Sequence, residues 1–78
     1  MKDALNLILT SIVDKPEEVE IKEEEQDGFI TFTLRVAKED MGKVIGKEGK
    51  VIRAIRNVIK ILAIKQNKKV QVNLEEFS

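Results

Sequence analysis

The feature that most constrains the fold of this chain is a pair of glycines set between two helical patterns. Gly46 and Gly49 enclose Lys47 and Glu48 within residues 44–55, which read VIGKEGKVIRAI. A glycine at the end of a short helix lets the chain turn through a positive φ without a Cβ penalty. The second glycine leaves room for a ligand's backbone, and the next helix begins with unpaired N–H groups and its positive dipole end at the same gap. This arrangement is typical of a phosphate-binding loop.

Two glycines at this spacing also fit an ordinary corner between helices, in which they serve only as caps. The apolar spacing of Ile45, Ile52 and Ile55 and a concentration of basic residues favour the binding interpretation here. Those basic residues are Lys43, Lys47, Lys50, Arg53 and Arg56.

The formal net charge of zero conceals two oppositely charged halves. Residues 1–40 carry 5 Lys or Arg against 11 Asp or Glu, whereas residues 41–78 carry 9 against 3. Between Lys43 and Lys69 the only acidic residue is Glu48. A run of like charge is often only a solvated face, but its coincidence with the glycine pair makes the basic half a candidate surface for a polyanion.

Composition narrows the class of protein. The 78 residues are expected to form one domain, residues 1–78, which buries only about 60% of its unfolded surface. The chain contains no Cys and no His, so disulfides, thiolate metal sites and the commonest general base are missing. It has no apolar run of 18 residues, so we expect no membrane span, and we expect no cofactor.

Hydrophobic periodicity divides the chain into three helices and three strands. The predicted helices are residues 3–13, a short helix ending at Ile45, and residues 50–64; the predicted strands are residues 18–25, 29–37 and 69–74. Turns are predicted at residues 26–28 and 66–67, and Asp40 is a predicted N-cap for the short helix. The strictest alternation lies in the second strand, where one face carries Ile30, Phe32, Leu34 and Val36.

The element order α-β-β-α-α-β predicts a two-layer α+β domain, with a three-stranded mixed sheet and helices on one face. The first two strands form an antiparallel hairpin, and the third can lie parallel to the second because a two-helix crossover precedes it. The acidic first strand would then be an edge, where Glu23, Glu24 and Glu25 discourage strand-to-strand aggregation.

The glycine pair between two helices, within this element order, resembles a type II KH domain. The residues that carry the resemblance are Ile45, Gly46, Gly49 and Ile52, and the likeness extends over the whole chain. The run Met41–Lys50 is similar to the small stand-alone bacterial KH proteins of the KhpA family. That resemblance implies a cytoplasmic single-stranded RNA-binding protein that acts as an RNA chaperone or post-transcriptional regulator. It also implies a frequent homodimer, commonly paired with a larger KH-domain RNA-binding protein.

In KH domains the G-x-x-G loop clamps the backbone of about four unpaired nucleotides. The resemblance implies that backbone N–H groups at the start of the second helix meet phosphate oxygens and that Lys47 adds a point charge. Val44, Ile45 and Ile52 are candidates for the aliphatic floor of the base groove, although a core role is the simpler interpretation for Ile52 and Ile55. The implied RNA-binding set is Lys43, Val44, Ile45, Gly46, Lys47, Glu48, Gly49, Lys50, Arg53 and Arg56.

Two features predict modest affinity and weak sequence preference. Glu48 places a carboxylate in the loop, where it repels phosphate, and the chain has only three aromatic residues for base stacking.

An enzyme is not expected, since no hydroxyl residue has an evident base partner and the loop is too short for a P-loop. The alternatives that remain are a KH-fold protein-interaction module with weak or no RNA binding, and a single-stranded DNA binder.

The apolar surface of the longest helix predicts self-association. Its apolar residues sweep an arc of roughly 200°, against the roughly 100° that one core-facing stripe requires. The N-terminal helix can cover part of the excess through Leu5, Ile8 and Ile12. The remainder predicts a contact patch for a homodimer or a related KH partner, with the interface residues Ala54, Val58 and Ile61.

Overall fold

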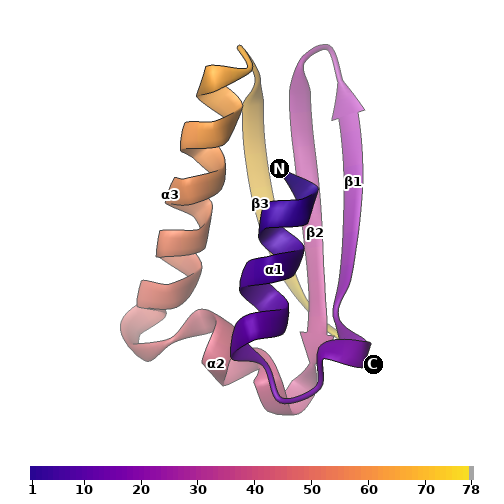
Figure 1. Cartoon of the computed structure of the whole chain (residues 1–78), viewed down its shortest axis with the longest axis vertical. Helices are drawn as coiled ribbons and strands as arrows, with labels where there is room; N and C mark the ends of the chain where they lie inside the picture. Colours follow the sequence, from indigo (N-terminus) through magenta and orange to yellow (C-terminus); the bar gives the residue numbers. More distant parts are fainter. Residues whose placement is uncertain (78) are drawn as a thin grey trace.

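The computed structural model describes residues 1–77, without the side chain of Phe77, and places its helices on one face of a three-stranded sheet (Figure 1). The elements in chain order are α1 (Lys2–Ile12), β1 (Glu20–Gln26), β2 (Phe29–Ala37), α2 (Met41–Ile45), α3 (Lys50–Lys65) and β3 (Lys69–Phe77). Short 3₁₀ turns occupy Pro16–Glu18, Lys38–Asp40 and Lys47–Gly49. The predicted α-β-β-α-α-β order and the two-layer α+β class are confirmed.

The sheet has the order β1-β2-β3, with β1 antiparallel and β3 parallel to β2. The acidic strand β1 is therefore an edge, as predicted, and β3 forms the opposite edge beside α3 (Figure 1). The hairpin turn between β1 and β2 consists of Asp27 and Gly28, which both have a positive φ, 54° and 78°. Two consecutive residues of this kind form the two-residue turn whose twist suits a hairpin.

Two predicted strand boundaries are wrong. The first strand starts at Glu20 rather than at residue 18, because Pro16 opens a 3₁₀ turn that ends at Glu18. The last strand continues to Phe77 rather than ending at residue 74. Its alternation of apolar residues stops there, but pairing with β2 continues, and Arg35 Nε lies 3.2 Å from a carboxylate oxygen of Glu75.

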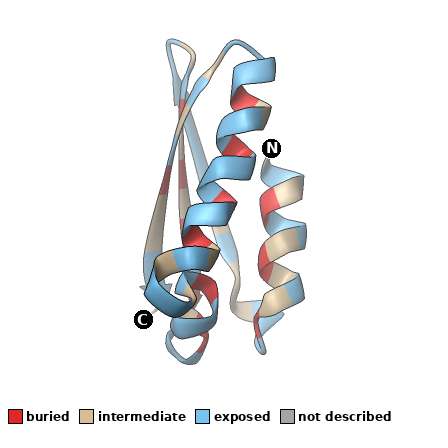
Figure 2. Ribbon diagram, turned by 90° about the vertical axis from the view of Figure 1, so that its left-hand side faces the viewer, coloured by how far each residue is buried: buried red, intermediate tan, exposed pale blue. Residues whose placement is uncertain are grey.

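The core lies between the sheet and the helices. The predicted inward face of β2 is fully buried, and the buried positions of α1 and α3 face the strands (Figure 2). The buried helix residues are Leu5 and Leu9 of α1 and Ile52, Ile55, Ile59 and Ala63 of α3. Among the described residues, no helix is both long enough and apolar enough to cross a membrane.

Asp40 holds the N-cap position of α2, as predicted, but its side chain does not cap the helix. It has helical dihedral angles and makes no hydrogen bond to the first backbone N–H groups of α2. Its buried carboxylate instead accepts hydrogen bonds of 3.0 Å from the backbone N–H groups of Asp14 and Lys15. These bonds, above all that from Asp14, hold the pKa of the Asp40 carboxyl below its usual value, against the opposing effect of burial. Asp40 thereby ties the segment after α1 to the helix that leads into the glycine loop.

Candidate nucleic-acid interface

The glycine loop leaves α2 through a conformation that only glycine adopts readily. Gly46 has φ 75° and ψ 174°, and its N–H donates to the carbonyl of Gly42 at 2.9 Å, which closes α2. A Cβ at this position would lie 2.8 Å from the Cβ of Val51 and 2.9 Å from its backbone nitrogen. Gly46 is therefore required for the close packing of the loop against the start of α3, in addition to any role in ligand approach.

The second half of the loop is held by hydrogen bonds to its own backbone. Glu48 and Gly49 are both left-handed, with φ of 57° and 74°. The Gly49 N–H donates to the Gly46 carbonyl at 3.2 Å, and the Lys50 N–H donates to the Lys47 carbonyl. These two amides are occupied by the loop itself, which leaves the amides of Lys47 and Glu48 as candidates for a phosphate oxygen.

Arg53 stabilises the loop from the first turn of α3. Its guanidinium donates a 2.6 Å hydrogen bond to the backbone carbonyl of Glu48, the left-handed residue at the tip. A Cβ built on Gly49 would meet only that guanidinium, at 3.7 Å. The space over Gly49 is therefore open, and a ligand's backbone can approach there, whereas the space over Gly46 is filled by Val51.

The structure gives the predicted site residues different surroundings. Lys47, Glu48, Lys50, Arg53 and Arg56 are exposed, and Ile45 is partly exposed beside the loop. Val44 must be removed from the contact set, because it is 0% exposed and packs in the core beneath α2. The same correction applies to Ile52 as a groove floor: it is buried and belongs to the core, as the alternative interpretation had it.

Lys43 pairs with an acidic residue outside the loop. Its Nζ forms an exposed ion pair with the carboxylate of Asp14, in the segment after α1. The hydrogen bond from the Asp14 backbone N–H to Asp40 holds this segment near the start of α2. The role of Lys43 in RNA binding stays a prediction, with which this ion pair competes.

A shallow groove of about 350 Å³ runs between α3 and the free edge of β3. Arg56 spans it, and its Nε donates a 3.3 Å hydrogen bond to the backbone carbonyl of Val72. The other residues that line the groove were not predicted from the sequence: Asn57, Lys60, Val70, Gln71 and Asn73. Lys60 could have been found, since it follows the predicted residue Arg56 at an interval of four and so shares its helical face. The groove residues of β3 could not be predicted, because the sequence alone does not show which edge of the sheet lies beside α3.

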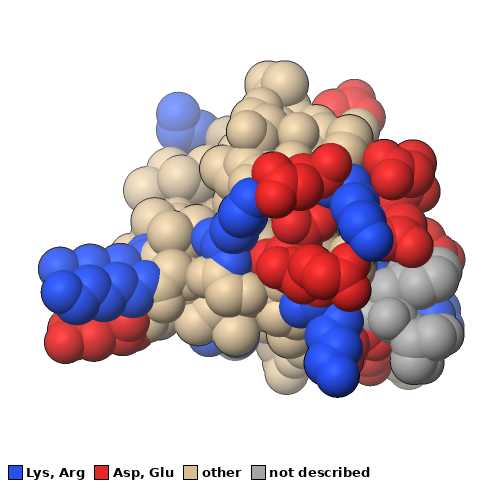
Figure 3. All heavy atoms as spheres, turned by 90° about the horizontal axis from the view of Figure 1, so that it is seen from below, with Lys and Arg blue, Asp and Glu red and all other residues tan. Residues whose placement is uncertain are grey.

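The end of the molecule that carries the loop has mixed charge. Seen from that end, acidic side chains gather on the side of β1, and basic side chains alternate with them (Figure 3). The side of α3 carries Lys50, Arg53, Arg56 and Lys60 on one helix. The candidate polyanion surface that the basic half of the sequence predicted therefore includes a continuous strip of basic side chains along α3. Within the described residues, no group of side chains is arranged to hold a metal ion.

Comparison with known proteins identifies the family. A family model described as the KH domain of KhpA/KhpB matches residues 2–74, a range that includes both the glycine loop and the groove. The chain belongs to the KhpA/KhpB family of KH domains. Membership confirms the resemblance to KH domains that the sequence suggested.

Curated relatives in the KhpA/KhpB family match over nearly their entire length. The chain is 50% identical to the RNA-binding protein KhpA of Clostridium perfringens over 74 residues, which cover 95% of this chain and 99% of the relative. It is 47% identical to the RNA-binding protein KhpA of Chlamydia caviae over 76 residues, 97% of each chain. It is 41% identical to the RNA-binding protein KhpA of Listeria monocytogenes over 76 residues, 97% of this chain and the whole relative.

Proposed function

We propose that this chain is a non-catalytic protein that binds single-stranded RNA, with its backbone at the glycine loop and its bases in the groove between α3 and β3. The observation that carries the proposal is the continuity of these two features along one helix. Arg53 contacts the loop tip, and Arg56 crosses the groove at the level of Val72, three residues further along α3. The relatives named as RNA-binding proteins support the choice of ligand.

The loop suits a phosphate through its backbone more than through its net charge. Lys47 and Glu48 are both exposed, so their side-chain charges largely offset each other near a bound phosphate. The open space at Gly49 and the backbone amides of Lys47 and Glu48 remain available. We therefore expect modest affinity that depends on few phosphate contacts.

The groove suits bases without strong sequence discrimination. Its floor is aliphatic, through Val70 and Val72, and its rim carries the amide side chains of Asn57, Gln71 and Asn73. Amides can both donate to and accept from a base edge, so several bases fit the same contacts. This supports a chaperone or post-transcriptional regulator with broad targets, and a cytoplasmic location belongs to the same proposal.

The test is the salt dependence of binding to a single-stranded RNA and to the DNA of matched sequence. The logarithm of affinity should fall against the logarithm of salt with a slope of about −2 to −3, since single strands contribute about −0.7 per phosphate contact. A variant with Lys47→Asp and Glu48→Asp should lose RNA binding while its circular dichroism stays native. Equal affinity for RNA and DNA would favour the DNA alternative, and no binding to either would favour the interaction module.

We also propose a homodimer, or a heteromer with a larger KH-domain protein, through an apolar stripe on α3. Val58 is 43% exposed and Ile61 is 56% exposed, and Ala54 lies one turn earlier on the same side. These residues recur at intervals of four and three, so they form one continuous row. The row is separate from the core-facing side of α3, and a second apolar surface could cover it without blocking the groove.

A further inference from the structure

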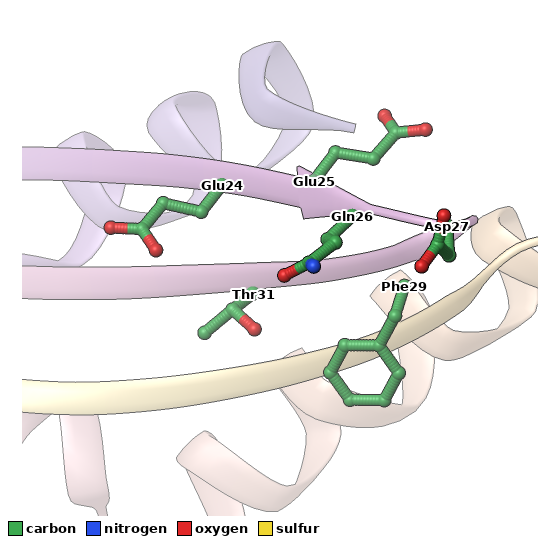
Figure 4. A pocket seen from close by; sticks show the side chains of 6 residues that line it. All are labelled: Glu24, Glu25, Gln26, Asp27, Phe29 and Thr31. Carbon is green, nitrogen blue, oxygen red and sulfur yellow. The ribbon is translucent and has the colours of Figure 1, made fainter.

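Phe29 is an aromatic side chain exposed at the end of the groove that is remote from the glycine loop. It is 41% exposed, whereas Phe32, the other aromatic side chain in the described part of the chain, is fully buried. Phe29 begins β2 and pairs with Lys69, the first residue of β3. Its ring lies over β3 on the face of the sheet that also carries Thr31 (Figure 4).

The ring borders a hollow of about 440 Å³ that continues the groove. Lys60 and Val70 line both the groove and the hollow, so the two are adjacent. The hollow adds Ile64, which is 60% exposed, and so combines an aromatic with an aliphatic wall. Its volume lies within the range of small-ligand sites.

Charge around the ring distinguishes its two sides. Lys60, Lys68 and Lys69 line the hollow, although Lys68 also forms an ion pair of 2.9 Å with Glu25. On the other side, the hollow beside the hairpin is lined by carboxylates and repels phosphate; its acidic residues are Glu24, Glu25 and Asp27 (Figure 4). Electrostatics therefore favours the approach of a polyanion to the ring from the α3 side over the side of Glu24 and Glu25.

The length of α3 shows where along a bound strand the ring lies. Sixteen residues make a helix of about 24 Å, and four nucleotides at stacked spacing cover about 14 Å. The hollow lies beside Ala63 and Ile64, in the last turn of α3, beyond the span of those four nucleotides.

We propose that a further unpaired nucleotide of the same strand stacks its base on Phe29, with its phosphates beside Lys60 and Lys69. This inference rests on the proposed RNA binding and extends its site. The face of an aromatic ring stacks with any base, so the contact adds affinity without sequence preference. The ammonium groups of the flanking lysines attract the phosphates, and salt weakens this attraction.

The test compares Phe29→Ala with the unmodified protein on oligouridylates of four and eight nucleotides. Removing a base-stacking ring should weaken the eight-nucleotide complex about fivefold or more and leave the four-nucleotide complex nearly unchanged. Phe29→Leu, which keeps an apolar side chain without the π-face, should resemble Phe29→Ala. Thr31→Ala, on the same face of β2, is the matched control and should bind as the unmodified protein does.

A direct readout is available because the chain contains no Trp. In Phe29→Trp the indole fluorescence should be quenched by the eight-nucleotide strand and not by the four-nucleotide strand. An unchanged affinity of Phe29→Ala for the longer strand, or an equal loss with both strands, would overturn the inference. If the unmodified protein binds neither strand, the proposed function itself fails, and the two failures are thereby distinguished.

Discussion

Gly46 and Val51 are packed so closely that position 46 has no room for a side chain. A Cβ on Gly46 would lie 2.8 Å from the Val51 Cβ and 2.9 Å from the Val51 nitrogen. Because a backbone atom is among those neighbours, a local side-chain shift cannot relieve the overlap. The two glycines of the loop therefore have different roles: Gly46 sets the angle between α2 and α3, and Gly49 leaves the loop surface open.

The difference predicts unequal costs for the same substitution. Gly46→Ala should lower the free energy of unfolding by about 3 kcal/mol, from the strained φ and the overlap with Val51 together. Gly49→Ala should cost only about 1 kcal/mol, because the left-handed φ is its sole penalty. Urea unfolding monitored by circular dichroism measures both, and equal costs would contradict the packing role of Gly46.

Glu48 should limit RNA affinity through its carboxylate. Glu48→Lys should tighten binding about fivefold, since one charge pair at about 4 Å in water is worth about 1 kcal/mol, and the salt dependence should steepen. The backbone carbonyl that Arg53 contacts is unaffected by the substitution. Glu17→Lys makes the same change of charge in the 3₁₀ turn before β1 and is the control. An equal gain in both variants would indicate a general effect of net charge.

Arg53 and Lys50 should respond differently to removal of their charge. Lys50→Gln should shallow the salt slope by about 0.7, as expected for one lost phosphate contact. Arg53→Gln should weaken binding more than Lys50→Gln, because it also releases the Glu48 carbonyl and loosens the loop tip. Titrations at several salt concentrations separate the two effects. Identical slopes and affinities for the two variants would show that Arg53 acts only as a charge.

The sequence was sufficient for the elements and the loop, because periodicity and glycine placement are local properties. Strand β2 and its buried face follow directly from the alternation of Ile30, Phe32 and Leu34. The groove could not be derived in the same way, since it depends on β3 lying at the edge beside α3. The burial of Val44 and the ion pair of Lys43 are likewise tertiary effects, which no periodicity contains. The exposed ring of Phe29 was missed for the same reason.

Asp40 should make the stability of the domain depend on pH in the acidic range. The pKa of Asp40 is lower in the folded state than in the unfolded chain. Its contribution to the free energy of unfolding is therefore complete above the unfolded pKa of about 3.9, and it is lost as the pH falls through the folded pKa. Asp40→Asn should lower Tm by about 10 °C at neutral pH, because a neutral amide replaces a carboxylate that accepts two backbone bonds. The difference in Tm between the two proteins should shrink below about pH 4. A difference in Tm that stays constant down to pH 2 would show that the ionised carboxylate of Asp40 is not the source of the stabilisation.

The two exposed isoleucines of α3 should separate self-association from RNA binding. Ile61 lies in the apolar row with Ala54 and Val58, whereas Ile64 lines the hollow beside Phe29. Ile61→Asp should dissociate the dimer without unfolding, since it places a charge in an apolar contact, and Ile64→Asp should leave the dimer intact while weakening the eight-nucleotide complex. Sedimentation equilibrium and RNA titration measure the two properties. An unmodified protein that stays a monomer near 9 kDa up to a few hundred micromolar, or loss of the dimer in Ile64→Asp alone, would show that the row is not the interface.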